Sequence, residues 1–333
     1  MYTSDIPEYR IDLSLPERDR WSHVIRAEQR VGRRFTSDVA EVLKALPGFA
    51  RTALLAAYKL SGGRYVDEME AIAQRLNLDL RDVLAMQCSY ELSQGYEKVF
   101  GCTAGVRTFP TLGPVHVRAL DWPIPSFGDA TRVFRFVDGE REFVTVGVVG
   151  YVGVLSGMLP GAYSLSINYA PTSQLPGFDF GPAFLAREVL ENCDTYADAV
   201  SVLRDTPLAA PCFFTVCGAQ ADEFCVIERG RKDAAVRGAR VSVIAQANHH
   251  VSSKMTARNA AFHAVNEEGG SIYAFSKDRA ETLERHLRAL PANASIDDIA
   301  DTLDVDPVCN DDTYQQMLFA PKTGEWRAWR WTA

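Results

Sequence analysis

The sequence contains no long apolar run and little clustered positive charge. No stretch of about 18 apolar residues occurs, so no membrane span is expected. The 333 residues carry 35 Lys and Arg against 43 Asp and Glu, a formal net charge of −8. The densest basic group has helical spacing and predicts a solvated helix face rather than a contact for membrane headgroups; it consists of Arg26, Arg30, Arg33 and Arg34. No nucleic-acid partner is predicted, because such proteins gather Lys and Arg on one face.

The sequence also lacks a disulfide framework, a zinc motif and a secretory signal. Its 7 cysteines are an odd number spread over the chain, which favours reduced thiols. Cys212, Cys217 and Cys225 are poorly spaced for zinc, and the apolar residues around the first two predict a buried strand. The first residues, 1–5, contain no cationic or apolar signal region. We therefore expect a cytoplasmic protein, and we predict no metal and no cofactor.

The pattern of apolar residues changes at Cys102. Before it, helical spacing dominates, and after it short β-branched runs bounded by turn residues predict strands. The composition, 47% hydrophobic and 23% charged, is that of a soluble globular protein. These observations alone predict an α+β domain of enzyme size. The predicted helices cover 39–46 after a cap at 36–38, then 69–76, 183–190 and 196–203, and the predicted strands cover 115–117, 144–149, 212–217, 224–227 and 241–244.

Cys102 is the residue whose surroundings point most directly to chemistry. It follows Gly101, which lacks a Cβ and tolerates the strained backbone that an attack of the thiol on the preceding carbonyl requires. Cleavage there would give Cys102 an α-amine, whose pKa of ~7.7 to 8.0 suits a base near neutral pH. Arg118 and Asp121 follow 16 and 19 residues later, about the length of one β-hairpin, so both can reach the new N-terminus. The alternative is a buried structural cysteine beside a local Arg118–Asp121 ion pair.

Two adjacent histidines, His249 and His250, suggest a Cys-His dyad or a metal site. Adjacent residues of a strand point to opposite sides, and no further His or Cys lies at ligand spacing. An α-amine would also make an imidazole base redundant. We therefore predict polar loop histidines. From its neighbouring residues alone, Asn248 is predicted to lie in a turn. Asn168 fits a pocket residue and a turn at a strand end equally well.

Several segments along the chain share the pattern of one enzyme family. Together with Gly101 and Cys102, they resemble the cysteine Ntn hydrolases, in particular the branch of acid ceramidase and N-acylethanolamine acid amidase. The resemblance implies an Ntn-hydrolase four-layer αββα sandwich with an N-terminal helical pro-segment. The segments are Pro7–Leu13 as the opening strand, Glu68–Ala73 in the pro-segment helices, Gly150–Gly157 and Pro160–Ser166 as central strands, and Gln246–His249 as an asparagine turn.

The resemblance implies self-cleavage between Gly101 and Cys102. Residues 1–101 would then form the N-terminal fragment and residues 102–333 the catalytic fragment, and the two would stay associated.

The resemblance also assigns roles to residues near the cleavage point. Cys102 matches the family's nucleophile, and Arg118 and Asp121 match the residues that position and polarise it. Asn248 matches the oxyanion-hole asparagine. We therefore expect these four side chains to form one catalytic site.

Three further residues are implied to bind the substrate: Asn168, Tyr169 and Arg258. Tyr169 stands where the N-acylethanolamine amidases carry a glutamate. A phenol makes fewer and weaker hydrogen bonds than a carboxylate and adds apolar surface. We therefore expect a substrate whose amine half is less polar or bulkier than ethanolamine.

The leading hypothesis is a self-processing hydrolase of linear amides. Its substrate would be a small N-acyl amide with an apolar acyl group, and the reaction would pass through a thioester. One alternative is an acyltransferase that delivers the same thioester to an amine or another acceptor. The other is an unprocessed binding protein without catalytic activity.

Overall fold

The computed structural model describes residues 2–43, 63–92, 101–124, 126–172, 177–238, 241–259 and 275–332. Two β-sheets pack face to face at its centre. The six-stranded sheet runs in the order β1 (Tyr2–Thr3), β14 (Glu325–Trp331), β13 (Thr313–Ala320), β4 (Gly113–Asp121), β3 (Gly101–Phe109) and β12 (Val243–Gln246). All of its strand pairs are antiparallel.

The eight-stranded sheet lies against it. Its order is β11 (Ala234–Arg237), β10 (Phe224–Arg229), β9 (Cys212–Gly218), β8 (Tyr163–Tyr169), β7 (Ser156–Leu159), β6 (Arg141–Val148), β5 (Thr131–Asp138) and β2 (Glu8–Asp12). Only the last pair, β5 with β2, is parallel. Many strands of both sheets are buried on both faces, which explains their nearly continuous apolar sequences.

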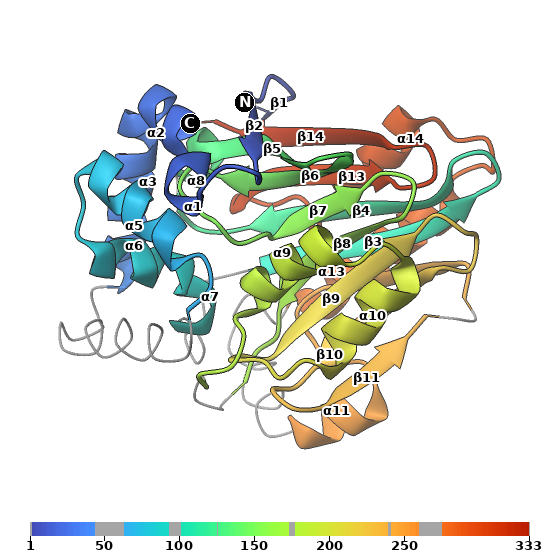
Figure 1. The fold of residues 1–333 in the computed structure, drawn as a ribbon. Helices are drawn as coiled ribbons and strands as arrows, with labels where there is room; N and C mark the ends of the chain where they lie inside the picture. The colour runs from blue at the N-terminus through green and yellow to red at the C-terminus, as the bar shows by residue number, and fades with distance from the viewer. Residues whose placement is uncertain are drawn as a thin grey trace.

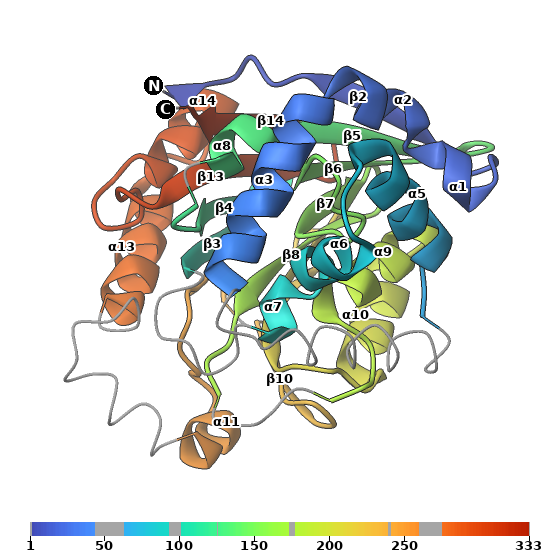
Figure 2. The same cartoon turned by 90° about the vertical axis from the view of Figure 1, so that its left-hand side faces the viewer.

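Helices cover the outer face of each sheet. On the eight-stranded sheet lie α9 (Pro182–Asn192) and α10 (Tyr196–Asp205), and on the six-stranded sheet lies α13 (Ser276–Ala289), with α14 (Ile296–Ala300) and the 3₁₀ turn η2 (Asp301–Leu303) beside it. Figures 1 and 2 show the resulting layers from two sides. The predicted four-layer αββα sandwich is confirmed. Two short helices also follow Cys102 in the chain, α8 (Ser126–Ala130) and α11 (Ser253–Arg258).

The N-terminal segment packs against one end of the sandwich. Its helices are α1 (Glu17–Arg20), α2 (Ser22–Ala27), α3 (Gln29–Val42), α5 (Val66–Leu76), α6 (Leu80–Gln87) and α7 (Ser89–Leu92). The segment is not only helical, because β1 joins one sheet and β2 the other. Both chain ends therefore lie side by side, where β1 pairs with β14. None of the helices within the described ranges is long and apolar enough to cross a membrane.

Most predicted elements are found, with three differences. The predicted cap at 36–38 is wrong, because these residues lie inside α3, where Phe35 and Val39 pack into the core. Gly150, with a φ of 83°, ends a turn, residues 151–155 belong to no strand, and the strand begins only at Ser156. β12 begins at Val243, two residues later than predicted. The predicted helix beyond residue 43 lies outside the described residues.

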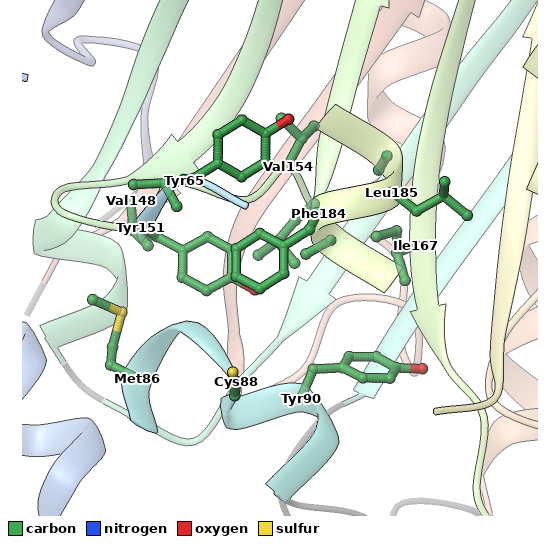
Figure 3. Close-up of a cluster of buried hydrophobic side chains, with 14 of the residues drawn as sticks. Tyr65, Met86, Cys88, Tyr90, Val148, Tyr151, Val154, Ile167, Phe184 and Leu185 are labelled. Carbon is green, nitrogen blue, oxygen red and sulfur yellow. The ribbon is translucent and has the colours of Figure 1, made fainter. Parts of the chain in front are cut away.

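One apolar core joins the N-terminal segment to the sandwich. Figure 3 shows Tyr65, Met86 and Tyr90 of this segment in one cluster with Val148 and Phe184. Since each part buries the other's apolar surface, separating them would expose a large apolar patch. The described part of residues 1–101 therefore shares its core with the sandwich, and Gly101 belongs to β3.

A buried ion pair reinforces this contact. Both Glu68 on α5 and Arg187 on α9 have fully buried side chains. The Arg187 guanidinium donates to both Glu68 oxygens, at 2.7 and 2.8 Å. Trp21 Nε1 donates to the same carboxylate at 2.6 Å and Arg20 Nη1 at 2.9 Å. Burial by itself would raise the pKa of Glu68, but the charge and hydrogen bonds of Arg187 hold it below its ordinary value.

We predict that Glu68→Ala lowers the free energy of unfolding by about 3 kcal/mol. Removing one partner of a buried pair leaves an uncompensated charge, and the loss lies at the low end because Glu191 still contacts Arg187. Urea unfolding measures the effect. The stabilisation that the Glu68 carboxylate gives wild-type protein should be complete above pH ~4.5 and decline as the pH falls. The reason is that the pKa of Glu68 is lowered in the folded chain.

The matched control is Asp67→Ala on the same helix. Its carboxylate is exposed and lies 3.8 Å from Arg18, so its loss should change stability by less than about 0.5 kcal/mol. Equal losses in the two variants would contradict a special role for Glu68.

Candidate active site

The β3–β4 hairpin brings the predicted catalytic residues together. Its register places Gly101 opposite Asp121, Cys102 opposite Leu120 and Ala104 opposite Arg118. Side chains alternate between the faces of a strand, so Cys102 and Arg118 share the face that meets the other sheet. Asp121 projects from the opposite face, toward α13. The hairpin expected from the sequence spacing is confirmed.

The Cys102 thiol is almost fully buried, with 2% of the residue exposed. Arg118 Nη2 donates to its sulfur at 3.2 Å, and the backbone N–H of Tyr169 also donates to it. Burial raises the pKa of the Cys102 thiol, opposed mainly by the charge of Arg118. On the other side of the residue, the Cys102 N–H donates to Asn248 Oδ1 at 3.0 Å. Both the sulfur and the nitrogen of Cys102 are therefore held by the predicted partners.

Arg118 is buried without an ion-pair partner among the described residues. Its Nη1 donates to Ser156 Oγ at 2.8 Å, and its Nη2 donates to the Ile167 carbonyl as well as to the sulfur. A guanidinium in this position favours an anion nearby, and the Cys102 sulfur is the atom in contact that can become one. Arg118 is thus placed to stabilise the thiolate.

Asp121 pairs with Arg279 rather than with Arg118. Arg279 Nη1 donates to Asp121 Oδ2 at 3.0 Å, and Thr313 Oγ1 donates to Oδ1 at 2.6 Å. Both charged residues are buried. The local Arg118–Asp121 ion pair considered from the sequence is therefore wrong, because the two side chains leave the strand on opposite faces.

Asn248 connects Cys102, Arg279 and Tyr169. Its Oδ1 accepts from Cys102 and, at 2.8 Å, from Arg279 Nη2, while its Nδ2 donates to the Tyr169 carbonyl at 2.8 Å. Its backbone N–H donates to Ser276 Oγ at 2.7 Å, which joins the loop to the start of α13. An amide nitrogen carries two hydrogens, so one remains for a further acceptor.

A small cavity adjoins the sulfur. Its volume is about 10 Å³, room for one water molecule. The lining combines Cys102 and Arg118 with mainly apolar and aromatic side chains, and its members include Leu120, Trp122, Tyr151, Leu155, Ile167 and Tyr169, with Ser89 and Tyr90 contributed by α7.

Tyr90 belongs to the N-terminal segment and is fixed against the catalytic part. Its hydroxyl donates to the Pro211 carbonyl at 2.8 Å, and its ring lies 5.3 Å from that of Tyr169. Figure 3 shows Tyr90 following Cys88 at the turn into α7. The N-terminal segment therefore forms part of the wall next to the Cys102 sulfur.

Of the three predicted substrate-binding residues, Tyr169 lines the cavity. Asn168 does not, since it is buried behind the site and its Nδ2 donates to the carbonyls of Gln246 and Ala247 at 2.9 and 3.3 Å. Its observed contacts hold the loop that carries Asn248. Arg258 ends α11, and its side chain lies outside the described part.

Both histidines lie in the loop that follows β12, as predicted. His249 Nδ1 lies 2.8 Å from Ser276 Oγ. His250 is buried, with its ring 4.8 Å from Phe213 and its Nδ1 3.5 Å from Glu228. The described ranges hold no group of three His, Cys, Asp or Glu that could bind a metal.

Sequence reasoning missed Arg279 and Tyr90. The sequence held a signal for Arg279, which lies on the same face of α13 as Ala280, Leu283 and Leu287. A charged residue in an apolar helix stripe indicates a buried charge with a specific partner. Tyr90 carries no such signal, because a tyrosine in an apolar helix is ordinary core.

Comparison with known proteins places this site in a family. A family model described as acyl-coenzyme A:6-aminopenicillanic acid acyl-transferase matches residues 136–319, more than half of the chain. The chain belongs to this family. A model of the beta subunit of N-acylethanolamine-hydrolyzing acid amidase also matches residues 4–57.

Individual relatives agree with this assignment. The acid ceramidases of Rattus norvegicus and Homo sapiens are each 26% identical over 264 and 266 residues, which cover 70% of this chain and 66% and 65% of those proteins. The match thus spans slightly less than two thirds of these relatives. The structure of a Caenorhabditis elegans N-acylethanolamine-hydrolyzing acid amidase ortholog shares the fold, with a TM-score of 0.55 and 23% identity over 69% of this chain and 100% of that chain. The predicted membership of the acid ceramidase and N-acylethanolamine acid amidase branch of the Ntn hydrolases is confirmed.

We predict that Arg279→Met lowers the free energy of unfolding by about 3 kcal/mol or more, since it leaves buried Asp121 without its cation. Urea unfolding measures the change. Adding Asp121→Asn to Arg279→Met should recover part of the loss, because it removes the unpaired charge. Arg288→Met is the control on the same helix, where an exposed pair with Glu284 contributes at most about 0.5 kcal/mol. A double variant no more stable than Arg279→Met would contradict the pairing.

Proposed function

We propose that the chain is a self-processing amidohydrolase whose nucleophile is Cys102 after cleavage from Gly101. One observation carries the proposal: the sulfur of Cys102 contacts a buried guanidinium while the nitrogen of the same residue is held by Asn248. A structural cysteine needs neither contact. The buried Cys212 differs, since burial raises the pKa of its thiol well above the ordinary value, and among the described residues the charge of Arg229 opposes this without a hydrogen bond to the sulfur.

Self-cleavage would begin with attack of Cys102 Sγ on the carbonyl carbon of Gly101. The new S–C bond forms as the C–N bond to Cys102 breaks, and the proton lost by the thiol ends on the released nitrogen. Water then hydrolyses the resulting thioester, which frees the carboxylate of Gly101 and the thiol. The products are residues 1–101 and residues 102–333, and Cys102 carries an α-amine.

Turnover would repeat this chemistry on an external amide. The α-amine accepts the thiol proton, the thiolate attacks the substrate carbonyl, and the amine returns the proton to the leaving nitrogen. In this proposal the second N–H of Asn248 donates to the developing oxyanion, and the Tyr169 N–H, which donates to the sulfur in the resting site, would turn to it as well. One such donor contributes roughly 2.7 to 4 kcal/mol in a comparable site.

The cavity supports a substrate with apolar groups next to the scissile bond. Tyr151 and Tyr169 present rings there. The ring of Tyr169 also supports an amine half less polar than ethanolamine, as its sequence position suggests. Because the cavity has room for little more than one water, substrate binding would require its lining to move.

Association of the two fragments after cleavage has the same structural basis. The shared core, the strand β2 and the Glu68–Arg187 pair do not depend on an intact bond at Gly101. We therefore propose that the mature protein is a complex of both fragments.

We predict that purified wild-type protein contains the two fragments, whereas Cys102→Ala remains a single chain and does not turn over an N-acyl amide. Intact-mass spectrometry and a hydrolysis assay measure both outcomes. Cys212→Ala and Cys217→Ala are controls that remove buried sulfur elsewhere. They should lower stability by ~0.5 to 3 kcal/mol and still cleave. An active wild-type protein with one intact chain, or equal loss of cleavage in all three variants, would reject the proposal.

Acyl transfer is a second candidate, favoured by the family model, whose description names an acyl-transferase. Both reactions share the thioester and differ in what attacks it. We predict that hydrolysis dominates, so one N-acyl amide should give mainly the free acid with or without an added amine acceptor. A new N-acyl product that grows with acceptor concentration, while the free acid declines, would favour transfer.

A further inference from the structure

A row of polar side chains extends from Arg118 into the space between the two sheets. On β4, His116 lies two residues before Arg118 and therefore on the same face. Ser164 and Ser166 on β8 and Ser156 on β7 approach this face from the other sheet. All of these residues are buried. Burying polar side chains between the sheets costs free energy unless they form hydrogen bonds there.

Ser156 holds the half of the Arg118 guanidinium that points away from the sulfur. Its Oγ accepts from Nη1 at 2.8 Å, and within the described residues Nη1 has no other hydrogen-bond partner. The other half, Nη2, reaches the sulfur. Because a guanidinium is planar and rigid, fixing one nitrogen fixes the direction of the other.

Within the described residues, no carboxylate contacts the Arg118 guanidinium. Where an arginine is normally oriented by a carboxylate, the described surroundings offer a serine hydroxyl, a backbone carbonyl and the sulfur. His116 remains neutral, since burial and then the charge of Arg118 lower its pKa to about 3. The charges acting on the sulfur are that of Arg118, which favours the thiolate, and that of Asp121, which disfavours it.

The remaining partners of the row lie beyond Ser156. Ser166 is its cross-strand partner on β8, and the Oγ of Ser166 lies 2.9 Å from Nε2 of His116. Ser164 Oγ lies 3.1 Å from Nδ1 of the same ring. Ser156 is thus the member of the row that touches the guanidinium.

We propose that Ser156 is a positioning residue that holds Arg118 in contact with the Cys102 sulfur and thereby sets how readily the thiol ionises. The inference rests on the proposed function, in which the Cys102 thiolate is the nucleophile. It concerns a residue on a different strand from the nucleophile and its hairpin, and one that is not among the residues lining the cavity at the sulfur.

The test is the pH dependence of Cys102 alkylation by iodoacetamide in the mature protein, followed by peptide mass spectrometry. In Ser156→Ala the midpoint should rise by about one pH unit, which is about a tenfold loss of thiolate at neutral pH. The kcat for an N-acyl amide should fall by a similar factor, with KM changed less than about twofold. Ser156→Thr, which keeps the hydroxyl, should titrate like wild type.

Ser164→Ala is the matched control. It removes an equally buried hydroxyl from the same row, but its contact is to His116 and not to Arg118. Its alkylation midpoint should stay at the wild-type value. A wild-type midpoint and kcat in folded Ser156→Ala, or an equal shift in Ser164→Ala, would overturn the inference.

Two further outcomes of the experiment also test the role of Ser156. If Ser156→Ala does not fold, Ser156→Thr and Ser156→Val make the same comparison at equal volume, and equal midpoints overturn the inference. If wild-type protein is not cleaved, the proposed function fails, while the Arg118–Cys102 contact is still present in the intact chain. Alkylation of intact Ser156→Ala and wild type then tests Ser156 separately.

Discussion

The antiparallel register of the β3–β4 hairpin is the constraint on which the site depends. It places Cys102 at the beginning of one strand and Arg118 and Asp121 near the end of the next. Because successive side chains point to opposite faces, Arg118 enters the space between the sheets and Asp121 faces α13. A shift of one residue would exchange these faces, so that the guanidinium would leave the sulfur and the carboxylate would enter the space between the sheets.

The side chains of the site are also held by elements outside the hairpin. Arg118 is oriented by β7 of the opposite sheet, and Asp121 by Arg279 of the helix layer on its own side. The N-terminal segment supplies β2 to the opposite sheet, while α7 lines the cavity. The sandwich and the N-terminal segment therefore form one structure, and none of these contacts requires an intact peptide bond after Gly101.

The sequence predicted what depends on local pattern and on the family resemblance. Short β-branched runs predicted the strands, and helical spacing predicted α5, α9 and α10. The number of residues between Cys102 and Arg118 predicted the hairpin. The partner of Asp121 could not be predicted, because Arg279 is 158 residues away and only tertiary packing brings it near. The cap at 36–38 failed for a similar reason, since burial of Phe35 and Val39 outweighs the local preference of Ser and Asp for a helix start.

The charges of the site explain why the two arginines are not interchangeable. Arg279 is neutralised by Asp121, so it contributes mainly geometry through Asn248, whose oxygen it shares with the Cys102 nitrogen. Arg118 lacks such a partner in the described part. Ionisation of Cys102 would create a thiolate that gives the Arg118 guanidinium an anionic partner. A proposed α-amine at Cys102 would therefore lie beside a neutralised Arg279–Asp121 pair and keep the Asn248 oxygen as its hydrogen-bond acceptor. Arg118 thus acts on the sulfur through its charge, against the effect of burial, whereas Arg279 acts on the nitrogen through the position of Asn248.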